Sequence, residues 1–166
     1  YIDFFRYGGI PCASVVVTRR CLGEKRFDET LTAVEDRHMW IRLLACERCD
    51  PERITEPLAI YSQRDNSVSS DINNMYHNEK QVITDVTETF DELSEYRSEA
   101  FARADYKLGK RHLKANQATK ARQALKKSIH AGAEDNRVYL LLILAYLPLP
   151  PGRSLAILER IQARIR

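Results

Sequence analysis

The pattern of hydrophobic and polar positions changes near residue 70. Upstream of that point, two short β-rich runs stand on either side of a helical pattern. Downstream of it, almost every segment carries apolar residues at helical spacing. The pattern therefore predicts a mixed N-terminal part and an α-helical C-terminal half.

The N-terminal part is predicted to contain two strands and a helix. Residues 13–18 include three consecutive valines, which is typical of a strand buried on both faces. Residues 54–61 form the second run, and Pro57 indicates an edge position or a bulge. Between them, residues 36–46 repeat apolar side chains at helical spacing. The predicted fold class is α+β, in part α/β, with the remnant of a sheet followed by an α-helical C-terminal region.

The C-terminal half is predicted to form a series of helices joined by short turns, so that neighbouring helices pack antiparallel. Asp71 is expected to cap the first of them. The predicted helices cover residues 71–93, 98–114, 118–131, 137–147 and 153–165.

One window of this half resembles a single tetratricopeptide-type helical hairpin. It runs from Leu108-Gly109 through Ala121 and Leu125 to Ala133. His112 and Ser128 depart from the pattern, and no second unit is clear. One such hairpin cannot bury its own apolar face. We therefore expect the helices to pack on one another, on the N-terminal part or on a partner.

Composition narrows the functional classes. Hydrophobic residues make up 44% of the chain and charged residues 30%, which argues against global disorder. The net charge of +3 is well short of a dedicated nucleic-acid binder, so no nucleic-acid partner is predicted. The longest apolar run, residues 138–147, is about half of the roughly 20 residues that a membrane span needs. No leader sequence is recognisable, and we expect a cytoplasmic protein.

Four cysteines are too sparse for a disulfide scaffold in a chain of this length. We expect Cys12, Cys21, Cys46 and Cys49 to be free thiols in a reducing cytoplasm. Cys46 and Cys49 have the spacing of half a zinc site, but the other two cysteines do not supply the second half. No metal ligand is therefore predicted in this chain.

Four motifs follow one another between residues 10 and 61. They are Ile-Pro-Cys-Ala-Ser-Val-Val-Val-Thr-Arg-Arg at 10–20, Phe-Asp-Glu at 27–29, Glu-Asp-Arg-His-Met-Trp-Ile-Arg-Leu at 35–43 and Glu-Pro-Leu-Ala-Ile-Tyr at 56–61. In this order and spacing they resemble the C-terminal half of the catalytic domain of inverting family-2 glycosyltransferases, which have the GT-A fold. The resemblance covers about residues 1–95 and leaves residues 96–166 as a helical tail.

The resemblance implies roles for five residues. An inverting transferase needs a carboxylate that takes the proton from the attacking acceptor hydroxyl. The resemblance assigns that role to Asp36, with Glu35 beside it at the substrate. Ser14 and Arg19 correspond to family positions near the cleft, and Arg64 stands where the family often has a histidine. From the residues alone, Asp36 as a helix cap, Ser14 as a satisfied hydroxyl and Arg19 as a solvated side chain stay open as alternatives.

The resemblance also implies what the chain lacks. The family's Asp-x-Asp motif holds a divalent metal, Mg²⁺ or Mn²⁺, and the diphosphate of the nucleotide-sugar donor. That motif belongs upstream of Tyr1, so we expect no metal bound by this chain and no turnover by the isolated chain. Asp28 and Glu29 are candidates for facing the cleft. The implied reaction transfers a sugar to a sugar or lipid-linked acceptor, in the synthesis of cell-surface polysaccharide or glycolipid.

Two further alternatives concern partners. The competing functional class is a non-enzymatic helical interaction module, in which residues 96–166 act and the rest is scaffold. Exposed strand edges in the isolated chain would favour a homodimer. The basic residues in 107–114 and 120–127 are expected to be solvated. The alternative is that they are attracted to anionic lipid head groups at the inner face of the membrane.

Overall fold

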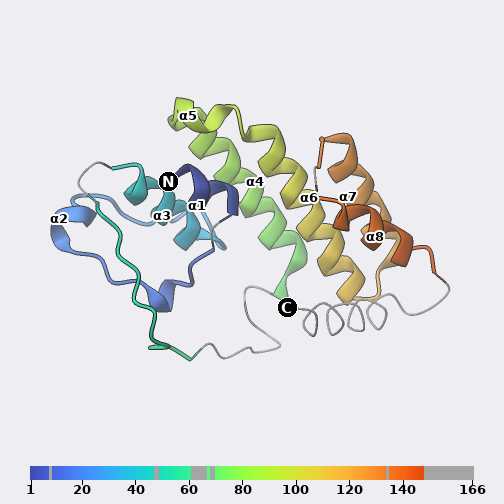
Figure 1. The fold of residues 1–166 in the computed structure, drawn as a ribbon, viewed down its shortest axis with the longest axis horizontal. Helices are drawn as coiled ribbons and strands as arrows, with labels where there is room; N and C mark the ends of the chain where they lie inside the picture. Colours follow the sequence, from blue (N-terminus) through green and yellow to red (C-terminus); the bar gives the residue numbers. More distant parts are fainter. Residues whose placement is uncertain (8, 47–48, 61–66, 68–69, 134, 148–166) are drawn as a thin grey trace. The chain divides into compact units, whose positions relative to one another are not determined.

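The computed structural model describes residues 1–7, 9–46, 49–60, 67, 70–133 and 135–147. These residues divide into two compact units, an N-terminal unit within Tyr1–Tyr96 and a C-terminal unit within Arg97–Arg166. The regular elements are α1 (Ile2–Tyr7), η1 (Cys12–Ser14), α2 (Arg19–Leu22), α3 (Glu35–Leu44), α4 (Ile72–Thr89), α5 (Asp91–Ser94), α6 (Arg97–Lys114), α7 (Ala118–His130) and α8 (Arg137–Leu144). Figure 1 labels the α-helices among them.

The predicted α+β fold is wrong, because the described residues contain helices and no β-strand. Of the first predicted strand, residues 12–14 form the short 3-10 helix η1, and Val15 is extended. Residues 54–60 have no regular structure, and residue 61 lies outside the described residues. The side chain of Val16 is 100% exposed, while Val15 and Val17 are partly buried against the cluster of Met39, Trp40 and Leu43. A β-strand forms its ladder of backbone hydrogen bonds with a neighbouring strand, and the described part of the chain contains no strand to pair with.

The N-terminal unit is built mainly on α3 and α4. The predicted helix at residues 36–46 is confirmed as α3, which buries Met39, Trp40 and Ile41. Asp71 caps α4 as predicted, since its carboxylate accepts a hydrogen bond from the Asn74 amide at 2.9 Å. The predicted continuous helix from 71 to 93 is broken at Phe90, whose backbone is extended. Helix α5 follows as a separate short element.

A disulfide joins Cys21 to Cys49 across a separation of 28 residues, with the two Cα atoms 5.1 Å apart. It lies beside the apolar cluster of Met39, Trp40 and Leu43. The expectation of four free thiols is therefore wrong for this pair, while Cys12 and Cys46 are not in a disulfide. Because Cys49 is bonded to Cys21, it cannot act as a zinc ligand. The described residues contain no group of three or more side chains placed to hold a metal.

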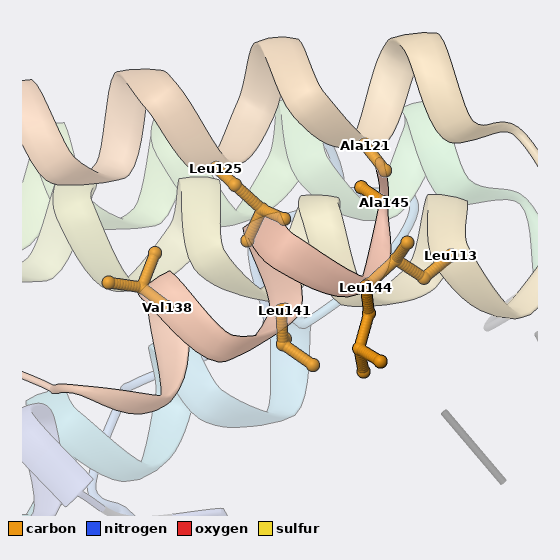
Figure 2. Close-up of a cluster of buried hydrophobic side chains, with 7 residues drawn as sticks. All are labelled: Leu113, Ala121, Leu125, Val138, Leu141, Leu144 and Ala145. Carbon is orange, nitrogen blue, oxygen red and sulfur yellow. The ribbon is translucent and has the colours of Figure 1, made fainter. Parts of the chain in front are cut away.

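The C-terminal unit contains the α6–α7 hairpin, and α8 packs on α7 and more lightly on α6. The predicted helices at 98–114 and 118–131 are confirmed as α6 and α7, and the one at 137–147 is shorter, ending at Leu144. The helix predicted for 153–165 lies outside the described residues. Figure 2 shows the shared core of Leu113, Ala121, Leu125, Val138, Leu141, Leu144 and Ala145.

Hydrogen bonds account for the two departures from the hairpin pattern. The buried Ser128 hydroxyl donates to the Ala102 carbonyl oxygen at 2.6 Å. A ring nitrogen of buried His112 lies 2.7 Å from the side-chain oxygen of Gln117. Each polar side chain is thus satisfied inside the hairpin, so neither penalises the fold.

None of the described helices is both long enough and apolar enough to cross a membrane.

Gly109 of α6 lies directly against Leu125 of α7. A Cβ at this position would lie 2.6 Å from Cγ and 2.7 Å from Cδ2 of Leu125. Gly109→Ala gains up to about 1 kcal/mol of helix propensity. The clash costs about 1–3 kcal/mol, so we expect net destabilisation in urea unfolding. In a Leu125→Ala background the clash is absent, and the same substitution should stabilise. Destabilisation of equal size in both backgrounds would contradict this packing.

The disulfide generates a second prediction, because a cross-link closing a loop of 28 residues restricts the unfolded chain. Cys21→Ser should lower the free energy of unfolding of the N-terminal unit by about 2–4 kcal/mol, measured by chemical denaturation. Cys12→Ser is the matched control, since Cys12 is exposed and outside the pair. Alkylation under denaturing conditions without reductant should modify two cysteines, and modification of all four would show that the pair is not formed.

Candidate functional site

A groove of about 500 Å³ opens on the N-terminal unit. Helix α4 supplies most of its lining, and Asp28, Leu31 and His38 complete it. The α4 side chains used below are Tyr76, Lys80, Gln81, Asp85 and Glu88, which recur at helical spacing and so lie on one side of the helix. The groove therefore brings together segments that are some 50 residues apart in the sequence.

His38 is held against α4 by Asp85. Its Nε2 lies 2.7 Å from Oδ2 of Asp85. The histidine is 4% exposed, whereas the Asp85 side chain is 54% exposed. The other ring nitrogen, Nδ1, is buried and has no hydrogen-bond partner among the described residues. Nε2 of His38 is occupied by Asp85, and Nδ1 is buried. A ligand in the groove can therefore contact the Asp85 carboxylate but neither nitrogen of His38.

Asp28 is fixed on the opposite side of the groove by Thr30. Its Oδ1 accepts hydrogen bonds from the Thr30 hydroxyl at 2.7 Å and from the Thr30 amide at 2.9 Å. The hydroxyl first, and then the amide, lower the pKa of Asp28, and the nearby charges of His38 and Arg42 act in the same direction. Gln81 donates to the same hydroxyl at 3.2 Å, which ties this loop to α4.

Buried polar contacts hold α3 and its preceding loop against α4. Arg37 pairs with Glu79 at 2.9 Å, and their side chains are 12% and 5% exposed. The same guanidinium donates to the Phe5 carbonyl oxygen at 2.7 Å, which links α1 to the pair. The buried amide oxygen of Asn78 accepts from the Thr32 amide at 2.9 Å. These contacts determine where Asp28 and His38 lie relative to α4.

Helix α3 begins at a strained residue. Val34, at the N-cap, has φ 55° and ψ 19°, a left-handed conformation that β-branched residues rarely adopt. Because Val34 holds the cap position and its side chain makes no cap hydrogen bond, Asp36 is not the cap of its helix. A strained residue next to candidate site residues is a feature that clusters at functional sites.

None of the described residues that were predicted to catalyse or bind substrate lines this groove. Glu35 and Asp36 lie in the first turn of α3, half-buried, and an Asp36 oxygen accepts from the Arg37 amide at 2.6 Å. Neither lines the groove. Ser14 is exposed and donates to the Pro11 carbonyl oxygen at 2.8 Å, and Arg19 is exposed at the start of α2. Arg64 lies outside the described residues. The structure thus brings Glu35 and Asp36 together, but it does not bring Ser14 or Arg19 to the groove.

Sequence reasoning missed most of the groove. Asp28 belongs to a motif that was expected to face the cleft, and it does line the groove. His38 lies within a recognised motif but had no assigned role, and Asp85 and Glu88 were not singled out within the helix predicted for residues 71–93. The spacing of charged residues along one side of α4 was the available signal. It could not show that His38, 47 residues from Asp85, would be the partner.

Comparison with known protein families, with curated proteins and with solved structures found no match. The family resemblance of residues 1–95 therefore rests on the four sequence motifs.

The groove offers hydrogen-bond acceptors and an aromatic ring. Asp28, Asp85 and Glu88 contribute carboxylates, Gln81 an amide and Tyr76 a ring over which the Lys80 ammonium lies at 5.5 Å. Carboxylates and amides bind hydroxyl groups, and an aromatic face covers apolar C–H surface. The described residues here do not form a metal cluster. This chemistry suits a small hydroxyl-rich ligand.

The Asp28 contacts give a testable shift. Thr30→Val removes the hydroxyl donor but keeps the amide, so the pKa of Asp28 should rise toward its ordinary value in a carbon-detected NMR titration. A carboxyl whose folded pKa is lowered stabilises the protein above its unfolded pKa, and this contribution is lost as pH falls through the folded pKa. The variant should therefore lose stability at neutral pH and converge on wild type in acid. An unshifted Asp28 titration would contradict the assigned contact.

Proposed function

We propose that this chain is the acceptor-side part of a nucleotide-sugar glycosyltransferase that acts in the synthesis of cell-surface polysaccharide or glycolipid. The observation that carries the proposal is the meeting of two motifs at one groove. Asp28 comes from the Phe-Asp-Glu motif and His38 from the Glu-Asp motif, and both line it. Motifs that lie apart in the sequence but share a groove are what a common substrate site requires.

In this proposal the groove binds the part of the acceptor that lies away from the reacting hydroxyl, since Asp36 does not line the groove. The carboxylates of Asp28, Asp85 and Glu88 accept hydrogen bonds from acceptor hydroxyls, and Tyr76 offers its ring to the sugar face. His38 acts through Asp85, which it holds in place at 2.7 Å. The lowered pKa of Asp28 keeps that carboxylate ionised at neutral pH.

The catalytic step is assigned to the start of α3. Asp36 takes the proton of the acceptor hydroxyl, and Glu35 lies beside it in the same helical turn. The nucleotide-sugar donor and its Mg²⁺ or Mn²⁺ bind to residues outside this chain, so the chain alone is inactive. Ser14, Arg19 and Arg64 remain candidates for substrate contact in the complete enzyme. We place the reaction in the cytoplasm, at the inner face of the membrane.

A non-enzymatic interaction module is the second candidate. It is favoured by the C-terminal unit, whose α8 exposes large apolar side chains although its other side is packed. In that case the C-terminal unit carries the function, and the N-terminal groove is incidental. Sugar transfer that depends on Asp36 would exclude this alternative as the main function.

The transferase proposal is tested by Asp36→Asn in the full-length parent protein. General-base catalysis contributes about 10²–10⁴-fold, so transfer of labelled sugar from a nucleotide-sugar pool to a cell-envelope extract should fall by about that factor. Asp91→Asn is the matched control, because Asp91 is an exposed carboxylate in the first turn of another helix. It should leave the rate unchanged.

Three outcomes separate the alternatives. Full transfer by the Asp36→Asn protein overturns the assignment of the base. A well-folded parent protein that transfers no sugar, and whose reading frame has no Asp-x-Asp motif upstream, overturns the transferase. Capture of a specific partner that survives Asp36→Asn then favours the interaction module.

A further inference from the structure

Helix α8 is apolar on both of its sides. Val138, Leu141 and Leu144 face the core that it shares with α6 and α7 (Figure 2). Five other large side chains are exposed, and we call them the outer α8 stripe: Tyr139, Leu140, Ile143, Tyr146 and Leu147. They recur at intervals of three, four and seven residues, so they lie along one side of the segment. A helix that is apolar all round is normally covered on all sides.

Cationic side chains of α7 border this stripe. The Arg122 guanidinium lies 4.9 Å from the centre of the Tyr146 ring, and the Lys126 ammonium lies 5.9 Å from it. Arg122 also donates to the Ala145 carbonyl oxygen at 2.8 Å, which fixes its position at the end of α8. Lys120 and Lys127 are exposed on the same helix. Arg122 and Lys126 therefore adjoin the apolar stripe at Tyr146, and two further cations stand on the same helix.

The C-terminal unit carries an excess of basic residues. Residues 97–166 contain fifteen Lys and Arg against five Asp and Glu, whereas residues 1–96 contain eleven against eighteen. Among the described acidic residues of the C-terminal unit, Glu99 pairs with Arg103 and Asp135 with Arg137. Asp105 is buried. None of these three described carboxylates is paired with Lys120, Lys126 or Lys127 of α7.

We propose that the outer α8 stripe and the α7 cations dock the C-terminal unit onto a membrane surface that contains anionic lipid. The stripe enters the boundary between head groups and acyl chains, Tyr139 and Tyr146 lie at the level of the head groups, and Lys126 and Lys127 meet lipid phosphates and carboxylates. Amphipathic attachment of this kind needs both apolar area and positive charge. The inference does not depend on the transferase proposal.

Other occupants fit less well. A nucleic-acid backbone would neutralise the cations but leave Ile143 and Leu147 in water. A second copy of this surface would bring two sets of α7 cations together, which is unfavourable by like-charge repulsion. An anionic lipid surface satisfies the stripe and the cations at the same time.

The experiment uses the full chain and sedimentation with vesicles. Vesicles of phosphatidylcholine mixed with phosphatidylserine should bind the protein, vesicles of phosphatidylcholine alone should bind it much more weakly, and high salt should release it. Lys126→Glu/Lys127→Glu should weaken binding by about 30-fold or more, because each basic residue near an anionic surface contributes roughly fivefold. The matched control is Lys25→Glu/Arg53→Glu, which changes the net charge equally in the N-terminal unit and should leave binding unchanged.

The apolar part is tested separately by Ile143→Ser. Ile143 is 59% exposed, so the substitution spares the core. It should weaken vesicle binding by about tenfold through lost apolar burial. Circular dichroism then shows whether the helices are retained. In an Ile143→Trp variant, the added fluorescence should shift to the blue on binding vesicles.

Several results overturn the proposal. Equal binding to both vesicle types, or equal weakening by the control pair, removes the role of the α7 cations. Fluorescence from Trp at 143 that is already blue-shifted without vesicles, with no further change on their addition, shows that residues 148–166 or a second copy cover the stripe. The protein could instead bind duplex DNA in a salt-sensitive way and fail to bind vesicles. If Lys126→Glu/Lys127→Glu abolishes that DNA binding, the surface is a nucleic-acid site.

Discussion

The buried ion pair between Arg37 and Glu79 is the contact on which the N-terminal unit depends. It joins α3 to α4 at 2.9 Å, and the same guanidinium binds the Phe5 carbonyl oxygen of α1. One cation thus contacts three helices, in a unit whose described residues contain no sheet. Removing one partner of a buried pair costs about 3–5 kcal/mol, because the other charge is left buried. The groove depends on this pair, since one wall stands on α3 and the other on α4.

Helices and strands differed in how well the sequence predicted them, for a physical reason. The hydrogen bonds of a helix lie within one segment, so the apolar spacing of residues 98–114 and 118–131 was sufficient to locate α6 and α7. A strand must be completed by a neighbour, and residues 13–18 and 54–61 have no such neighbour in the described chain. The valine run indicated strand propensity, but propensity alone does not provide the neighbouring strand with which backbone hydrogen bonds would form.

Long-range pairing limited the prediction of the site in the same way. Asp28 was recognised because it belongs to a local motif. Its counterpart Asp85 was not recognised, because only the folded chain brings it to His38. The Cys21–Cys49 bond was also missed, since the spacing of cysteines does not reveal which ones meet. Asp36 was selected through a family resemblance, and the structure places it in the first turn of α3 and outside the groove.

Acidic and basic residues are unequally divided between the two units, and this division determines how the chain behaves as a polyelectrolyte. A net charge of +3 describes neither unit, because it averages an acidic N-terminal unit and a strongly basic C-terminal one. The chain is a block polyampholyte, in which acid and base are segregated along the sequence rather than mixed. Added salt screens the repulsion within each block as well as the attraction between blocks. The overall isoelectric point therefore conceals two surfaces that would be drawn to opposite counter-charges.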